Sequence, residues 1–110
     1  MATTYKVLAQ SNPSATTETT LYTVPSATST VVSTISICNQ AAGSATYRIA
    51  VRPSGQGTTT AKNYLVYGAT VAAADTTFLT LGTTLATGDV ITVYASSATL
   101  SFSAFGSELS

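Results

Sequence analysis

The feature that most constrains the fold is a side-chain alternation with a period of two, which runs through much of the chain. Between residues 30 and 39, one face of an extended chain carries Val31, Ile35 and Ile37. The other face carries Val32, Thr34, Ser36 and Cys38. Residues 45–52 alternate in the same way. Since β-branched and aromatic side chains fit a pleated surface better than a helix turn, both segments are predicted strands, and the turn-forming residues 40–44 predict that they form a hairpin.

Proline and glycine divide the rest of the chain into further short segments of strand character. Pro25 and Pro53 close two of them, because proline lacks the amide hydrogen that a ladder needs, and Gly88 marks a turn. The further predicted strands are residues 4–10, 19–24, 63–71, 76–81, 90–95 and 100–105, with 72–75 as a turn or one helical turn. This spacing predicts an all-β fold, a single β-sandwich or jelly-roll-like domain of about eight short antiparallel strands over residues 1–110.

The composition is hydrophobic enough for a folded core. Hydrophobic residues make up 45% of the chain and charged residues only 7%, so the low hydrophobicity and high net charge of disordered chains are both missing. Small hydroxyl side chains are abundant, with 23 Thr and 14 Ser among 110 residues. We expect the core to be dominated by the larger apolar residues of the predicted strands: Val31, Ile35, Ile37, Tyr47, Ile49, Val51, Val66, Leu79, Ile91, Val93 and Phe102.

The charge balance argues against several kinds of partner. Four basic and four acidic side chains give no net charge, and the basic ones are scattered, whereas nucleic acids and anionic membranes attract clustered Lys and Arg. No basic segment followed by an apolar run opens the chain, and no long apolar stretch predicts a membrane span. We therefore expect synthesis in a cytoplasm and no binding to nucleic acid or membrane.

The residues that usually carry catalysis are scarce. The chain has no His, its single cysteine Cys38 lies within a predicted strand, and its carboxylates are far apart in sequence: Glu18, Asp75, Asp89 and Glu108. Asp75 and Asp89 could meet across strand ends, but carboxylates in turns more often bond to nearby backbone amides. Gly55 and Gly57 flank Gln56 in a segment without the lysine and helix of a phosphate-binding loop. We expect no enzymatic activity, no metal and no cofactor.

The candidate contact residues are mostly aromatic or charged. The tyrosines could pack at the edge of the core, stack on sugars or lie in an interface. Arg48 and Arg52 leave the same face of one predicted strand, where they could bind a carboxylate or a phosphate or remain solvated. Residues 2–12, 54–62 and 105–110 are predicted contact arms, and 54–62 is predicted to be the most mobile loop. The candidate interface residues are Tyr5, Lys6, Arg48, Arg52, Gln56, Lys62, Phe105 and Glu108.

Four segments carry a resemblance to a known class of protein. They are Leu21-Tyr-Thr-Val-Pro25, Val31-Val-Ser-Thr-Ile-Ser-Ile-Cys-Asn39, Thr46-Tyr-Arg-Ile-Ala-Val-Arg-Pro53 and Asp89-Val-Ile-Thr-Val-Tyr94, followed by a terminal Leu-Ser-Phe-Ser-Ala-Phe-Gly-Ser-Glu at residues 100–108. In this pattern the chain resembles small virion structural proteins of tailed bacteriophages, including those of cyanophages. The resemblance implies a β-rich protein present in many copies on a capsid or tail, without catalytic residues.

These observations together predict a structural role in a virus particle. We expect a capsid decoration or cement protein that binds the major capsid protein or other virion proteins, is located in the virion, and forms a homo-oligomer such as a trimer. The alternative is a protein of the tail, collar or a fibre, with a glycan- or host-binding face in which tyrosines near Gln56 or Asn63 take part. A small hydrolase is disfavoured because the catalytic groups are missing.

Overall fold

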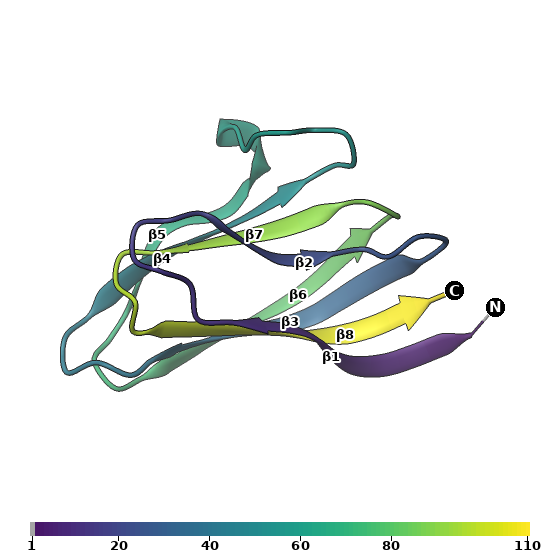
Figure 1. Ribbon diagram of the computed structural model, residues 1–110. Coiled ribbons are helices and arrows are strands. Elements are labelled where there is room, and N and C mark those ends of the chain that lie inside the picture. Colours follow the sequence, from purple (N-terminus) through teal and green to yellow (C-terminus); the bar gives the residue numbers. More distant parts are fainter. Residues whose placement is uncertain (1) are drawn as a thin grey trace.

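The structure, a computed structural model, describes residues 2–110 as two four-stranded antiparallel sheets packed face to face (Figure 1). The eight strands are β1 (Thr3–Ser11), β2 (Thr19–Thr23), β3 (Ser29–Asn39), β4 (Ala45–Arg52), β5 (Tyr64–Val71), β6 (Thr76–Leu85), β7 (Val90–Ala95) and β8 (Leu100–Leu109). One 3₁₀ turn, η1 (Ala61–Asn63), precedes β5. The predicted all-β sandwich is confirmed, and β4 and β7 begin and end at the predicted residues.

The strand order is that of a jelly roll. Sheet A has the order β1-β8-β3-β6, and sheet B has the order β2-β7-β4-β5. The pairs are nested: β4 lies beside β5, β3 beside β6, β2 beside β7, and β1 beside β8. Such nesting results when one long antiparallel hairpin is rolled up, which is the double Greek key of the jelly roll. The β4–β5 connection, residues 53–63, is the tip of that hairpin.

The predicted hairpin of residues 30–39 and 45–52 is wrong. β3 belongs to sheet A and β4 to sheet B, so residues 40–44 cross from one sheet to the other. The buried side chain of Asn39, 1% exposed, holds this corner. Its amide donates to the carbonyl oxygens of Gly43 at 2.9 Å and of Val71 and Ala72 at 3.2 Å. A buried amide must find hydrogen-bond partners, and those of Asn39 lie in two places: the 40–44 connection and the end of β5 with the turn after it. Asn39 therefore favours a connection that crosses between the sheets over a tight hairpin turn.

A line of irregularities crosses sheet A and changes which side chains face inward. The register shifts between Val32 and Thr34 in β3, and between Val7 and Ala9 in β1. An extra residue in a strand reverses the faces beyond it. As a result Val32 is fully buried while Val31 lies on the outer face, and the expectation for these two valines is wrong.

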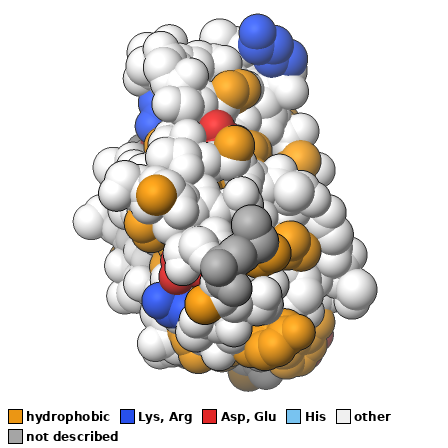
Figure 2. All heavy atoms as spheres, turned by 90° about the vertical axis from the view of Figure 1, so that its right-hand side faces the viewer, with side chains coloured by type: hydrophobic (Ala, Val, Ile, Leu, Met, Phe, Trp, Pro, Cys, Tyr) orange, Lys and Arg blue, Asp and Glu red, His pale blue; other side chains and the backbone are white. Residues whose placement is uncertain are grey.

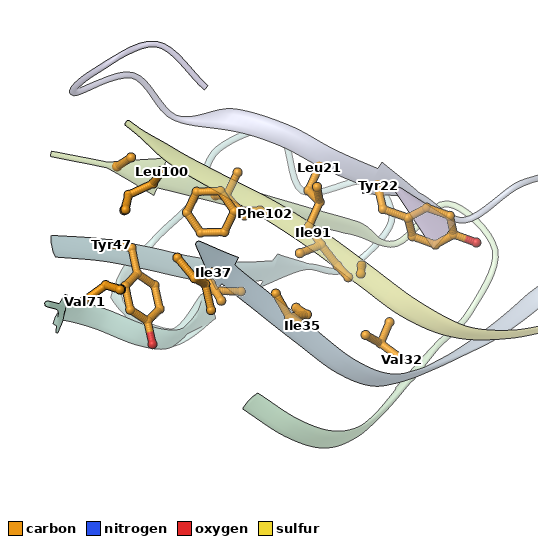
Figure 3. Packing of buried hydrophobic residues seen from close by; sticks show 14 of the residues in the cluster. Leu21, Tyr22, Val32, Ile35, Ile37, Tyr47, Val71, Ile91, Leu100 and Phe102 are labelled. Carbon is orange, nitrogen blue, oxygen red and sulfur yellow. The ribbon is translucent and has the colours of Figure 1, made fainter. Parts of the chain in front are cut away.

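The core lies between the two sheets (Figure 3). The expected core residues that are buried are Ile35, Ile37, Tyr47, Ile49, Ile91, Val93 and Phe102. Val51, Val66 and Leu79 are partly buried and pack against them. The rings of Tyr47 and Phe102 meet edge to face at a centroid distance of 6.2 Å, an arrangement that favours aromatic pairs. Buried residues that were not among the expected core residues include Leu21, Tyr22, Val24, Val71, Leu85 and Leu100.

The two ends of the chain are strands of sheet A and not free arms. β8 is flanked along its length by β1 and β3, and it continues to Leu109, four residues beyond the predicted end at 105. Ala2 and Ser110 exchange backbone hydrogen bonds of 2.7 and 3.0 Å, so N and C lie side by side (Figure 1). Residues 2–12 and 105–110 are therefore not free arms, because they pair within sheet A as the edge strand β1 and as the end of β8. Their contact with a partner stays a prediction. Residues 72–75 form a turn.

Candidate interaction surfaces

The eight candidate interface residues do not form one patch. Two lie on the outer face of sheet A, in β1 and β8: Tyr5 and Phe105. Four lie on the outer side of sheet B or in the 53–63 loop: Arg48, Arg52, Gln56 and Lys62. Lys6 and Glu108 form an ion pair with each other, with 3.2 Å between Nζ and Oε1. The molecule thus has two distinct candidate surfaces on opposite faces.

The outer face of sheet A, called here the uncharged face, carries small hydroxyls and a few large apolar side chains. Its rows across the sheet are Gln10, Ser103, Ser36 and Phe78, then Val7, Phe105, Thr34 and Thr80, then Tyr5, Ser107, Val31 and Thr84. Over the described strands, none of these outward positions holds a charged side chain. Tyr5, Phe78 and Val7 are 84%, 69% and 49% exposed, which is unusual for side chains of their size.

Figure 2 shows the end of the molecule where the chain termini lie, with apolar side chains scattered over a mostly white surface and several charged side chains among them. A shallow hollow of about 400 Å³ opens among β1, β3 and β8. Its lining residues are Tyr5, Lys6, Val31, Ser33, Phe105, Gly106 and Ser107. Of these only Lys6 is charged, and its ammonium is paired with Glu108. The hollow therefore offers a partner hydroxyls and apolar surface.

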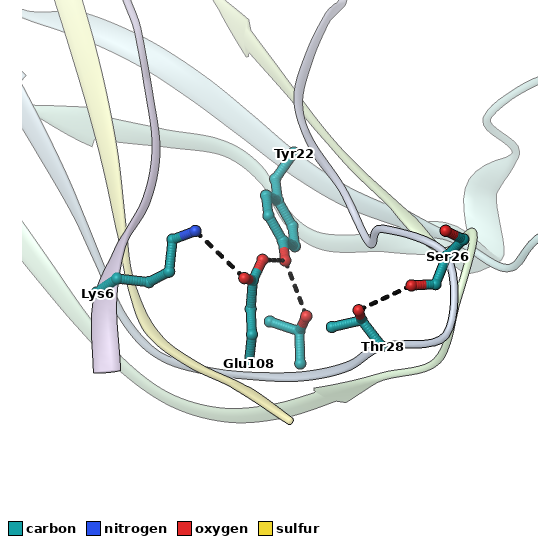
Figure 4. Close-up of polar contacts among 6 residues, drawn as sticks. Lys6, Tyr22, Ser26, Thr28 and Glu108 are labelled. Atoms are coloured by element: carbon teal, nitrogen blue, oxygen red, sulfur yellow. Dashed lines mark hydrogen bonds and ion pairs between the residues drawn. The ribbon is translucent and has the colours of Figure 1, made fainter. Parts of the chain in front are cut away.

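A series of polar side-chain contacts closes this end of the sandwich next to the hollow (Figure 4). Lys6 donates to Glu108, which also accepts a short hydrogen bond from the Tyr22 hydroxyl, and that hydroxyl lies 2.8 Å from the buried Thr30 Oγ1. The hydrogen bond from Tyr22 holds the pKa of Glu108 below its usual value; partial burial opposes this, and Lys6 adds to it. Burial, together with the bond to Glu108, raises the pKa of Tyr22 to about 12. Four strands from both sheets are joined by these contacts.

The Glu108 contacts predict a loss of stability in acid. A carboxyl whose pKa is lowered on folding binds a proton more readily in the unfolded chain, so its stabilisation is complete above its usual pKa of 4.5 and is lost as the pH falls through the folded-state value. We expect urea unfolding between pH 3 and 7 to show this loss, and Glu108→Gln to reduce the slope. Part of the slope that persists in Glu108→Gln should belong to Glu18, whose pKa is also lowered, so the double variant with Glu18→Gln should show a smaller slope than Glu108→Gln alone. An unchanged slope in that double variant would contradict the assignment.

The outer face of sheet B, called here the tyrosine–arginine face, is built around Arg48. Its guanidinium carbon lies 4.3 Å from the ring centroids of both Tyr67 in β5 and Tyr94 in β7. Tyr64 meets Tyr67 edge to face, with 4.8 Å between centroids. The prediction that Arg48 and Arg52 leave one face of the strand is confirmed. Cation–π contacts on both sides hold the Arg48 guanidinium in one place.

Glu18 and the 53–63 loop border this face. Glu18 Oε2 accepts hydrogen bonds from Thr92 Oγ1 at 2.7 Å and from Thr59 Oγ1 at 2.5 Å. Partial burial acts to raise the pKa of Glu18, but these bonds and the attraction of Arg52 outweigh it, and the pKa is lowered. Arg52 Nη1 donates to Gly57 O at 2.7 Å, so the loop predicted to be most mobile is tied to sheet B.

Between the loop and β5 lies a shallow cavity of about 440 Å³. Its lining combines two aromatic rings with hydroxyls from the loop: Thr59, Thr60, Ala61, Tyr64 and Tyr67. Gln56 and Asn63, which sequence reasoning placed near a glycan-binding face, bond to each other beside it. The sequence could not indicate Tyr94, because only the pairing of β7 with β4 brings it to Arg48.

The two remaining carboxylates serve turns, as expected. Asp75 accepts a hydrogen bond from the Thr76 amide at 2.8 Å, and Asp89 accepts from the amides of Ser54 and Ala86 at 2.9 Å. They lie at opposite ends of β6 and do not meet. Cys38 is half-buried in β3. Among the described residues, no three His, Cys, Asp or Glu side chains are grouped as a metal site would require.

These surfaces have to be interpreted from their own residues. In residues 2–110 no helix has the length and apolar character needed to cross a membrane. No family model, no curated protein and no solved structure matches the chain.

Proposed function

We propose that this protein is a non-enzymatic structural protein of a bacteriophage virion, and that it decorates the capsid by docking on the lattice of the major capsid protein. The observation that carries the proposal is the uncharged face. It presents Tyr5, Val7 and Phe78 on a sheet surface that has hydroxyls in place of charges. The likeness of the sequence to small phage virion proteins supports the same role.

The chemistry of the uncharged face suits a permanent contact with another protein. Interface centres are depleted of charged residues and enriched in aromatic ones, because burying an unpaired charge is costly. A hydroxyl can replace its hydrogen bonds to water with hydrogen bonds to a partner, at a smaller desolvation cost than a charged group has. An exposed aromatic side chain such as Phe78 gains most when a neighbour removes it from water. This face therefore gains stability from crowding on a lattice.

The jelly-roll fold is compatible with this role. Eight-stranded jelly rolls occur in viral capsid domains, but also in lectins and cupins, so the fold alone does not assign a function. A virion adds repetition: a small protein that contacts several lattice subunits, or that forms a trimer with its own copies, gains avidity from many modest contacts. A domain of this size benefits from the additional burial.

Capsid binding can be tested with two substitutions on the uncharged face. Purified Phe78→Ser and Tyr5→Ser proteins are expected to bind capsids assembled without this protein at least about tenfold more weakly than the parent does, as measured by co-sedimentation. Tyr67→Ser, which removes an exposed tyrosine from sheet B, is the matched control and is expected to bind like the parent. Unimpaired binding by both sheet A variants, with thermal melting unchanged, would refute docking through this face.

The second candidate is a protein of the tail, collar or a fibre. The tyrosine–arginine face favours it, because these parts of a virion contact the host surface. The number of copies per particle distinguishes a capsid location from a tail location. Capsid decoration predicts on the order of hundreds of copies per particle, whereas tail rings have low multiples of six, set by their symmetry. Quantitative mass spectrometry of purified virions would measure this number.

A further inference from the structure

We infer that the tyrosine–arginine face is a separate binding site for an acidic carbohydrate, with a sugar ring against Tyr64 and Tyr67 and a sugar carboxylate on Arg48. This inference does not depend on a place in the capsid or on the uncharged face. It depends on three features of sheet B: the state of Arg48, the lining of the cavity, and the local balance of charge.

Arg48 is held in position without being paired. Tyr67 and Tyr94 lie on either side at 4.3 Å, and the hydrogen bonds among the described residues include none from its guanidinium. The second arginine of the strand differs, since Arg52 donates to Gly57 O and faces Glu18. A guanidinium presents a planar fork of donors that matches a carboxylate, and restraint by two rings lowers the entropy lost when a ligand binds. Arg48 is thus prepared for an anion that the chain itself does not supply.

The adjoining cavity has the lining expected for a sugar. Tyr67, 65% exposed, belongs both to the cavity wall and to the pair of rings around Arg48, so the two features are continuous. A tyrosine ring offers an apolar surface for the C–H groups of a sugar and a hydroxyl at its edge. Thr59 and Thr60 add hydroxyls from the loop opposite. A volume of about 440 Å³ accommodates a small ligand such as one or two sugar rings.

The charges select an acidic ligand over a neutral one. Three of the four basic side chains, Arg48, Arg52 and Lys62, belong to the outer side of sheet B or its loop. Glu18, which borders this face, accepts hydrogen bonds from Thr59 and Thr92 and is attracted to Arg52. Asp89, at the start of the loop, accepts from the amides of Ser54 and Ala86. Neither carboxylate pairs with Arg48, whose charge therefore remains uncompensated beside the tyrosines.

The test is an NMR titration of the ¹⁵N-labelled full chain with 3′-sialyllactose and with trigalacturonate, each compared with neutral lactose. We expect saturable shifts from at least one acidic sugar at residues 46–50, 59–67 and 92–95, and none from lactose. Arg48→Gln is expected to weaken that binding at least tenfold, and Tyr67→Ala to weaken it more than Tyr67→Phe, which keeps the ring. Phe78→Ser, on the uncharged face, is the matched control and is expected to bind the sugar normally.

Three results would overturn the inference. Equal binding of lactose would remove the role of the carboxylate, and equal binding of sodium sulfate would show a simple anion site without sugar recognition. Absence of shifts with both acidic sugars would exclude the site altogether. Because Phe78→Ser is expected to lose capsid binding and keep sugar binding, while Arg48→Gln is expected to lose sugar binding, failure of this site and failure of the proposed function are distinguished.

Discussion

Substitution of Gly106 by alanine is expected to destabilise the protein by about 3 kcal/mol or more, at the upper end of the cost of overpacking. A Cβ at this position would lie 2.0 Å from the carbonyl oxygen of Val31, a backbone atom that cannot move without separating β8 from β3. Because β8 is the strand that both β1 and β3 pair with, the damage is expected to spread across sheet A. Urea denaturation at neutral pH measures the loss.

Gly82→Ala is the matched control for this substitution. Gly82 lies in β6 of the same sheet, and a Cβ there would meet no atom within 4 Å. Its replacement is expected to change stability by less than about 1 kcal/mol, in either direction, because alanine also restricts the unfolded chain. If Gly106→Ala and Gly82→Ala unfold at the same urea concentration, the close approach of β8 to β3 is refuted.

Truncation of Ile35 or Ile49 to alanine is expected to cost roughly 2–5 kcal/mol, since each side chain is 1% exposed and would leave a cavity between the sheets. Small domains are stable by only about 5–15 kcal/mol, so either variant should unfold at much lower urea concentration. Val31→Ala, on the outer face, is expected to cost less than about 1 kcal/mol. A loss for Val31→Ala as large as that for Ile35→Ala would show that the inner face of β3 is misassigned.

The alternation of side chains predicted most of the fold, and its failures have a common physical cause. Period two identifies strands and their faces only while each residue has one partner across the ladder. The extra residue Ser33 breaks this condition, and so Val31 and Val32 exchange faces although both are equally good strand residues. The pattern also cannot distinguish a hairpin from a crossing between sheets, because a five-residue connection fits both. The signal that could have decided was Asn39, a polar residue at the end of an apolar strand face.

The candidate surfaces were predictable only within single strands. Arg48 and Arg52 share a face because they are four residues apart in a regular strand. Their surroundings come from elsewhere in the chain: Tyr67 reaches Arg48 through a shifted register, and Tyr94 arrives with β7. Lys6 and Glu108 were both expected at an interface, yet they neutralise each other across the β1–β8 ladder, a pairing between distant segments that composition and spacing do not encode.

The nested strand pairs have a consequence for how the chain is made. Every ladder in both sheets joins a strand from the first half of the chain, β1 to β4, to one from the second half, β5 to β8. The first four strands can form no ladder with one another, so on a ribosome they must wait, unpaired, until Tyr64 and the residues after it have emerged. An unpaired, charge-poor β segment is prone to aggregate. We expect the many Thr and Ser hydroxyls, which bind water, to keep this first half of the chain hydrated until its partner strands are synthesised.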